Sequence, residues 1–295
     1  MIQLVTVSLI WSVSFGLVKG NLAGIDPVFS AAVRLLIALA VFLPFLRVRG
    51  IDRRTAVRLA GIGAVQYGAM YIAYFLAFRF LAAYEVALFT IFTPIYVTLL
   101  NDGAARRLSP RNLMTALLAV AGTAIVVFRD LGNDGLLIGF LVVQASNLCF
   151  AFGQIAYRQV MPAGLGDRQV FALLYLGAVL LTVPAALLHG GAAIPVLTPT
   201  QVLTYLYLGS LASGLCFFLW NAGARRVEGG TLAIINNLKV PLAVAASLLL
   251  FGESADPIRL LAGGLVVLGA LIYNGWDNRR SRSVPRQPFS EESRS

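Results

Sequence analysis

A lysine and two asparagines lie inside an apolar segment, residues 231–251, of this 295-residue chain. They are Asn236, Asn237 and Lys239, and Pro241 follows two residues later. A charge at the centre of a membrane helix costs about 2.5–3.5 kcal/mol, so it is retained where it faces a wet cavity or a partner. An ammonium beside amides suits a substrate that carries a carboxylate. The stretch therefore predicts a substrate-binding wall, and a lysine that snorkels to the membrane surface is the alternative.

Two prolines mark predicted bends in membrane helices. Pro241 lacks a backbone N–H and disrupts the hydrogen bond to the carbonyl of Asn237, and Pro94 does the same to the carbonyl of Thr90. Carbonyls freed at membrane depth are tolerated beside a cavity. Pro94 and Pro241 are thus predicted gating positions, with a simple packing kink as the alternative.

Other apolar segments also place polar or aromatic side chains at predicted membrane depth. Tyr67 and Tyr71 share one helical face and lie too deep for interfacial anchors. Each such residue has a second interpretation, a hydrogen bond between helices. Arg34 is near the outer end of its segment, so structural and binding roles are both open. The candidates for substrate contact, besides Lys239, Asn236 and Asn237, are Trp11, Phe15, Gln66, Tyr67, Tyr71, Thr90, Phe92 and Asn147.

The composition is that of an integral membrane protein. Apolar residues make up 59% of the chain, and charged residues only 12%. The net charge of +10 does not indicate nucleic-acid binding, because most arginines lie in short clusters between apolar runs, as they do at a cytoplasmic membrane face. The expected partners are the lipid bilayer and a small-molecule substrate, with no nucleic acid and no obligate protein partner.

Ten apolar runs are long enough to cross a hydrocarbon core of about 30 Å. With the N-terminus inside, arginine-rich connections fall on the inner side, so both termini are predicted in the cytoplasm. A tail, residues 277–295, is rich in Arg, Ser and Pro and is predicted to be disordered. The predicted spans are 2–19, 28–46, 57–79, 82–101, 110–128, 136–158, 169–188, 202–224, 230–251 and 258–276.

An internal repeat divides these spans into two halves, residues 1–130 and 131–276. Pro94 and Pro241, Pro110 and Pro257, and Gly122 and Gly269 share a constant offset of 147 residues. Because each half has five spans, the second half must enter the membrane from the opposite side. The predicted fold is an all-α polytopic membrane protein of ten helices in two five-helix inverted-topology repeats. Such pairs typically form alternating-access transporters with a central site.

The ten spans, the Ala-Ala-Val-Arg34 sequence and the closing block Leu250-Phe-Gly-Glu-Ser-Ala-Asp-Pro257 resemble the drug/metabolite transporter superfamily, EamA type. The first half departs from the Gly-Glu turn, with Asn101-Asp102-Gly103 in its place. The resemblance implies secondary active transport of small metabolites across a bacterial inner membrane, often export of amino acids and related compounds, as by aromatic amino acid exporters.

Three alternatives to amino-acid export stay open. An exchanger of phosphorylated or organic-anion metabolites would pair two basic residues in its site. If Arg34 reaches the same cavity as Lys239, this substrate class is favoured over amino acids. A membrane-embedded enzyme is remote, because His189 is the only histidine and no acidic cluster exists to bind a metal. A non-transporting scaffold leaves Lys239 unexplained. Neither a cofactor nor a metal is expected.

Overall fold

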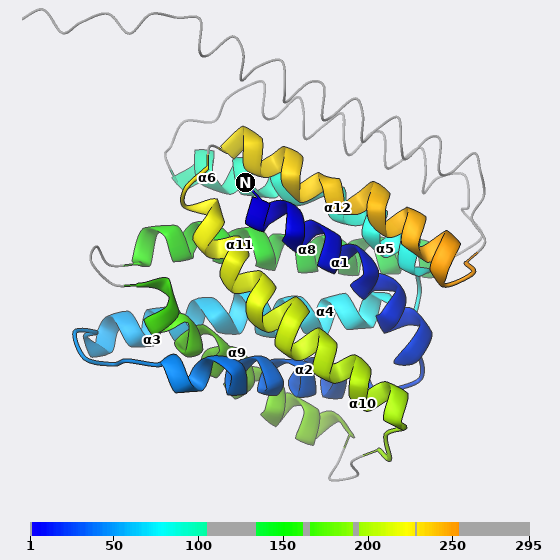
Figure 1. Ribbon diagram of the computed structural model, residues 1–295, viewed down its shortest axis with the longest axis horizontal. Helices are drawn as coiled ribbons and strands as arrows, with labels where there is room; N and C mark the ends of the chain where they lie inside the picture. Colours follow the sequence, from blue (N-terminus) through cyan, green and yellow to red (C-terminus); the bar gives the residue numbers. More distant parts are fainter. Residues whose placement is uncertain (1, 105–133, 162–165, 191–194, 228, 254–295) are drawn as a thin grey trace, which may run out of the picture.

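The structure is a computed structural model that describes residues 2–104, 134–161, 166–190, 195–227 and 229–253. Throughout these ranges every regular element is helical (Figure 1). Seven helices are long and apolar enough to cross a membrane, and a further apolar helix, Ile235–Leu250, is shorter. The described part of the chain therefore has the structure of an all-helical, multi-pass membrane protein.

Each predicted span that falls on described residues coincides with one helix or with consecutive helices. The predicted spans 110–128 and 258–276 and the predicted tail 277–295 lie outside the described residues, so the count of ten stays a prediction. The observed elements are α1 (Ile2–Asn21), α2 (Pro27–Phe42), η1 (Leu43–Phe45), α3 (Arg53–Gly63), η2 (Ala64–Ala69), α4 (Met70–Ala77), α5 (Ala83–Phe89), η3 (Thr90–Phe92), α6 (Thr93–Ala104), α8 (Asp134–Val160), α9 (Asp167–Gly190), α10 (Pro199–Leu206), η4 (Tyr207–Leu215), α11 (Cys216–Ala224) and α12 (Gly229–Leu250).

Side-chain caps fix where several helices begin. Asp26 accepts hydrogen bonds from the backbone N–H groups of Val28 and Phe29, both at 2.9 Å, and so starts α2. At α10, Thr198 and Gln201 cap each other's backbone N–H groups. These caps satisfy donors that the first turn of a helix leaves without partners.

The helices pack in a bundle in which α1 lies between α12 and α11 (Figure 1). On the other side, α2 and α3 both pack against α9. The approach of α3 to α9 requires glycine, because a Cβ on Gly177 would overlap the backbone of Ala60, and one on Gly63 would overlap the backbone of Leu174. These glycines thus allow α3 and α9 to pack backbone against backbone.

Four segments depart from α-helical geometry within the predicted spans, and one of them, η1, is a 3-10 turn at the end of α2. The segments η2 and η4 are π-helical, and η3 is a 3-10 turn directly before α6. The helix type thus changes just before Pro94. Pro241, in contrast, lies inside α12, which continues as α-helix from Gly229 to Leu250. A gating role for either proline stays a prediction.

Candidate functional site

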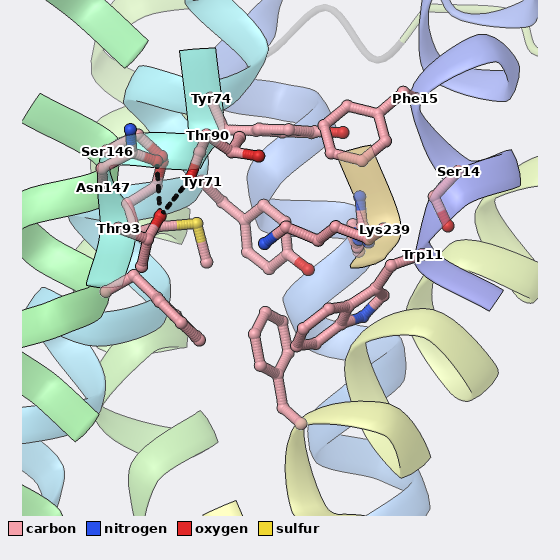
Figure 2. Close-up of a pocket in the computed structure, with 14 residues that line it drawn as sticks. Trp11, Ser14, Phe15, Tyr71, Tyr74, Thr90, Thr93, Ser146, Asn147 and Lys239 are labelled. Carbon is pink, nitrogen blue, oxygen red and sulfur yellow. Dashed lines mark hydrogen bonds between the residues drawn. The ribbon is translucent and has the colours of Figure 1, made fainter. Parts of the chain in front are cut away.

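A cavity opens at the centre of the bundle and contains about 530 Å³ of space between atoms, its mouth included. Helices from both ends of the sequence form its wall, with α1, α2, α4, α8, α11 and α12 all contributing (Figure 2). The lining residues are Trp11, Ser14, Phe15, Arg34, Met70, Tyr71, Tyr74, Thr90, Thr93, Ser146, Asn147, Phe150, Phe217 and Lys239.

Lys239 projects from α12 into this cavity, as Figure 2 shows. Its Nζ donates a hydrogen bond to Asn236 Oδ1 at 3.2 Å and lies 5.3 Å from the centroid of the Trp11 ring. The residue is only 7% exposed. The side chain therefore faces the cavity, as the sequence predicts, and its charge has amide and aromatic neighbours.

Arg34 brings a second cation to the same cavity from α2. Its Nε donates to Ser213 Oγ, and its guanidinium carbon lies 4.3 Å from the centroid of the Tyr71 ring. None of the described residues that line the cavity is acidic. Two buried cations without an acidic neighbour give the cavity a positive potential.

Aromatic side chains form the apolar part of the wall. Trp11 packs against Phe150 and Phe217, with ring centroids 6.3 and 5.0 Å apart. Its Nε1 donates to the carbonyl of Ala212 at 2.8 Å, and this carbonyl belongs to the π-helical segment η4. Phe15 and Tyr74 meet edge to face at 5.8 Å. These rings give the cavity an aromatic, apolar surface.

A polar wall lies where η3 and α6 meet α8 (Figure 2). Thr93 Oγ1 donates to the Thr90 carbonyl at 2.8 Å and lies 3.2 Å from Asn147 Oδ1. Asn147 Nδ2 donates to the Phe89 carbonyl at 2.9 Å. These bonds satisfy polar groups of the irregular η3 turn, so the turn is stable next to the cavity.

The structure brings six of the predicted contact residues together around the cavity, namely Trp11, Phe15, Tyr71, Thr90, Asn147 and Lys239. Asn236 and Asn237 lie outside the lining and are connected to the cavity through Lys239. Asn236 accepts the hydrogen bond from Lys239, and its Nδ2 donates to Asn237 Oδ1 at 3.4 Å. A role of these residues in substrate binding stays a prediction.

Three other predicted residues lie outside the cavity lining. Gln66 and Tyr67 are fully buried and bond instead to Asn221, whose Nδ2 donates to the Tyr67 hydroxyl at 2.7 Å. Phe92 packs in a separate apolar cluster with Ile91 and Val240. The positions of Gln66, Tyr67 and Phe92 thus do not support direct contact with a substrate in this cavity.

Sequence reasoning left several lining residues out of the candidate set. Arg34 is among them, together with Ser14, Met70, Tyr74, Thr93, Ser146, Phe150 and Phe217. Tyr74 shares a helical face with Tyr71, and the buried charge of Arg34 within an apolar segment is the same signal that singled out Lys239. The apolar members carry no such signal.

The fold and the site define a class of protein: a multi-pass helical membrane protein with a small, positively charged cavity at its centre. The EamA-like transporter family model matches residues 1–128 and 137–275. The chain therefore belongs to this family of the drug/metabolite transporter superfamily, and it is a transporter.

Relatives along the full length of the chain carry two kinds of name. A probable biotin transporter of Pseudomonas aeruginosa is 38% identical over 290 residues, covering 96% of this chain and 99% of the relative. The biotin transporter of Escherichia coli K12 is 38% identical, covering 95% of each chain. A probable amino-acid metabolite efflux pump of Salmonella typhimurium is 23% identical, covering 94% of this chain and 96% of the relative.

A solved crystal structure matches the fold with a TM-score of 0.67. The match covers 95% of this chain and 98% of the other, at 21% sequence identity. At this identity the match shows the fold alone.

Proposed function

We propose that this chain is a secondary transporter of biotin in the bacterial inner membrane. The observation that carries the proposal is the composition of the cavity, in which Lys239 and Arg34 face aromatic walls without a described acidic residue. Biotin has one carboxylate, a compact bicyclic body and no amine. Its carboxylate suits a cavity lined by cations, and its ring system matches the surface formed by Trp11 and Phe150.

The names of the relatives support the same substrate. The relatives named as biotin transporters are 36–38% identical to this chain, whereas those named as amino-acid efflux pumps are 22–23% identical. Amino acids, which the sequence predicts, fit this cavity less well, because their α-ammonium would add a positive charge beside Lys239 and Arg34. Biotin belongs to the organic-anion class that the sequence leaves open as an alternative.

We further propose that transport occurs by alternating access between two inverted five-helix halves. The 147-residue offset supports this architecture, and it also maps the π-helical segment η2 onto residues 211–216, which overlap η4. The cavity lies between helices of the two predicted halves, as expected for a site at a repeat interface. Cytoplasmic termini and bending at Pro94 and Pro241 belong to the same proposal.

Counterflow in proteoliposomes tests the substrate. Vesicles that contain the purified chain are loaded with unlabelled biotin and then placed in tritiated biotin. We expect transient accumulation of label, blocked by external biotin and unaffected by an equal concentration of tryptophan or phenylalanine. Accumulation of a labelled amino acid in place of biotin would contradict the proposal and favour the amino-acid export that the sequence predicts.

A further inference from the structure

The guanidinium of Arg34 is held in one orientation by its neighbours. Its Nε donates to Ser213 Oγ, and the Tyr71 hydroxyl lies 2.7 Å from the same Ser213 oxygen. The guanidinium carbon lies over the Tyr71 ring, 4.3 Å from its centroid, and 5.9 Å from the centroid of the Phe75 ring. Ser213 thus engages the Nε side of this group, and the Tyr71 ring packs against it.

Among the described residues, the rest of this guanidinium has no counter-charge. Arg34 is 2% exposed, and its Nη1 is buried without a hydrogen-bond partner in the described part of the chain. The ion pairs among the described residues are Arg79–Asp26 and Arg225–Asp167, and Arg34 is in neither. A buried charged donor without a partner is costly, so its retention at a cavity indicates that a ligand supplies the partner.

Lys239 is placed differently. Its ammonium already donates to Asn236, on the same helix, and stands beside the Trp11 ring. An ammonium is a point charge on a flexible stem, whereas a guanidinium is a rigid fork that matches the two oxygens of a carboxylate. The oriented fork of Arg34 is therefore the better carboxylate receptor of the two.

We infer that Arg34 binds the carboxylate of the transported substrate, and that Lys239 contacts the polar ring end. This inference rests on the proposed transport of biotin and assigns the specificity of the cavity for an acid to one side chain. Ser213 is a positioning residue, since its hydroxyl orients the guanidinium without touching the substrate.

The test compares biotin with biotinamide, a neutral analogue that keeps the ring system. Binding of tritiated biotin, and its displacement by biotinamide, are measured with the purified full chain in nanodiscs for wild type, Arg34→Gln and Lys239→Met. We expect Arg34→Gln to weaken biotin about 10- to 100-fold and biotinamide by less than about twofold. Lys239→Met should weaken both ligands by a similar factor. Retained biotinamide binding also shows that Arg34→Gln is folded.

The controls separate this inference from the proposed function. Arg79→Gln removes a surface arginine that pairs with Asp26 and should leave both affinities unchanged. Ser213→Ala should weaken biotin more than biotinamide, by a smaller factor than Arg34→Gln. If wild type binds biotin but Arg34→Gln weakens both ligands equally, or if Lys239→Met alone removes the preference for the acid, the inference is wrong. If wild type does not bind biotin, the proposed function itself fails.

Discussion

At the scale of single residues, the charge of the cavity depends most on the two buried cations. Lys239 shows why a cation there suits transport. Its ammonium is nearly fully buried, yet its described polar contact is one neutral amide, at Asn236. A fixed carboxylate would neutralise it permanently, whereas an amide leaves the charge available to a passing substrate.

Replacement of Lys239 by methionine tests this role. The chain has two lysines, so Lys19→Met is a matched control. Lys19 donates to the carbonyls of Phe78 and Leu81, at 2.8 and 2.9 Å, outside the cavity lining. We expect Lys239→Met to slow biotin counterflow about tenfold or more, since a hydrogen bond to a charged group contributes about 1.5–3 kcal/mol. Lys19→Met should lower thermal stability and keep affinity for biotin. Equal counterflow by wild type and Lys239→Met would show that the ammonium does not serve the substrate.

Residue type alone predicted part of the site. The cost of burying a charge was enough to predict, from the sequence, that Lys239 faces a cavity. The same cost applied to Arg34, but a long side chain near a span end can also reach the interface, so its direction could not be derived from position. Contacts with Ser213 and Tyr71, which belong to other helices, decide that direction.

At the scale of elements, the segment that follows α12 contacts two other helices, α5 and α1. The Glu253 carboxylate accepts hydrogen bonds from the backbone N–H groups of Ala83 and Tyr84, at 2.9 and 3.1 Å, in the first turn of α5. The Phe251 ring packs so closely on Gly16 of α1 that a Cβ there would overlap it. The contacts of Glu253 and Phe251 join α12, α5 and α1 and restrict their separation.

Loss of the Glu253 carboxylate should loosen this end of the bundle. Cavity access is measured by the rate at which an impermeant thiol reagent labels Ser14→Cys, in a chain with Cys149 and Cys216 replaced by alanine. We expect Glu253→Ala to raise the labelling rate severalfold, because the two hydrogen bonds that hold the end of α12 against α5 are removed. Asp52→Asn is the control, since the Asp52 carboxylate accepts from the backbone N–H of Thr55 at the start of its own helix. An unchanged rate for Glu253→Ala would show that the contact does not restrict access.

The close approach of α3 and α9 makes a prediction about stability. Gly177→Ala introduces a methyl group that overlaps the backbone of Ala60, and we expect a loss of about 1–3 kcal/mol in the free energy of unfolding. Gly61, on the same α3, has nothing within 4 Å of an added Cβ. Gly61→Ala should therefore be neutral or stabilise slightly. Unfolding of the two variants in detergent is compared by circular dichroism, and equal midpoints would contradict the packing described here.

Element types were predictable, but their irregularities were not. Hydropathy over about 20 residues gave the helices of the described chain close to their observed bounds. The prediction that Tyr67 and Tyr71 share one helical face assumed a regular period of 3.6 residues. The π-helical segment η2 ends between them and rotates the later residues around the axis. Tyr71 therefore lines the cavity, while Tyr67 stacks on Tyr175 with ring centroids 5.2 Å apart.

At the scale of the whole molecule, helices from both predicted halves line one positive central cavity. Composition was sufficient to establish a membrane protein, and the closing Phe-Gly-Glu block identified the family. The proposed substrate could not be derived in the same way. The proposal of an organic anion depends on a cavity lining in which no described residue is acidic. That lining forms only when α1, α2, α8 and α12 come together in the fold.

Ligand binding should stabilise the whole molecule. A ligand that binds the folded state at 100 times its Kd adds about 2.7 kcal/mol to the free energy of unfolding. We expect biotin to raise the melting temperature of the wild-type chain in detergent and to leave that of Lys239→Met nearly unchanged at the same concentration. An equal rise in both proteins would place the binding outside this cavity.

Equilibrium binding of tritiated biotin to the purified chain in nanodiscs tests the central claim most directly, with unlabelled biotin and tryptophan as competitors. The cavity chemistry predicts saturable binding that excess biotin displaces and excess tryptophan does not. Absence of saturable biotin binding, or displacement by tryptophan as readily as by biotin, would contradict the claim that this cavity accepts an organic anion without an amine.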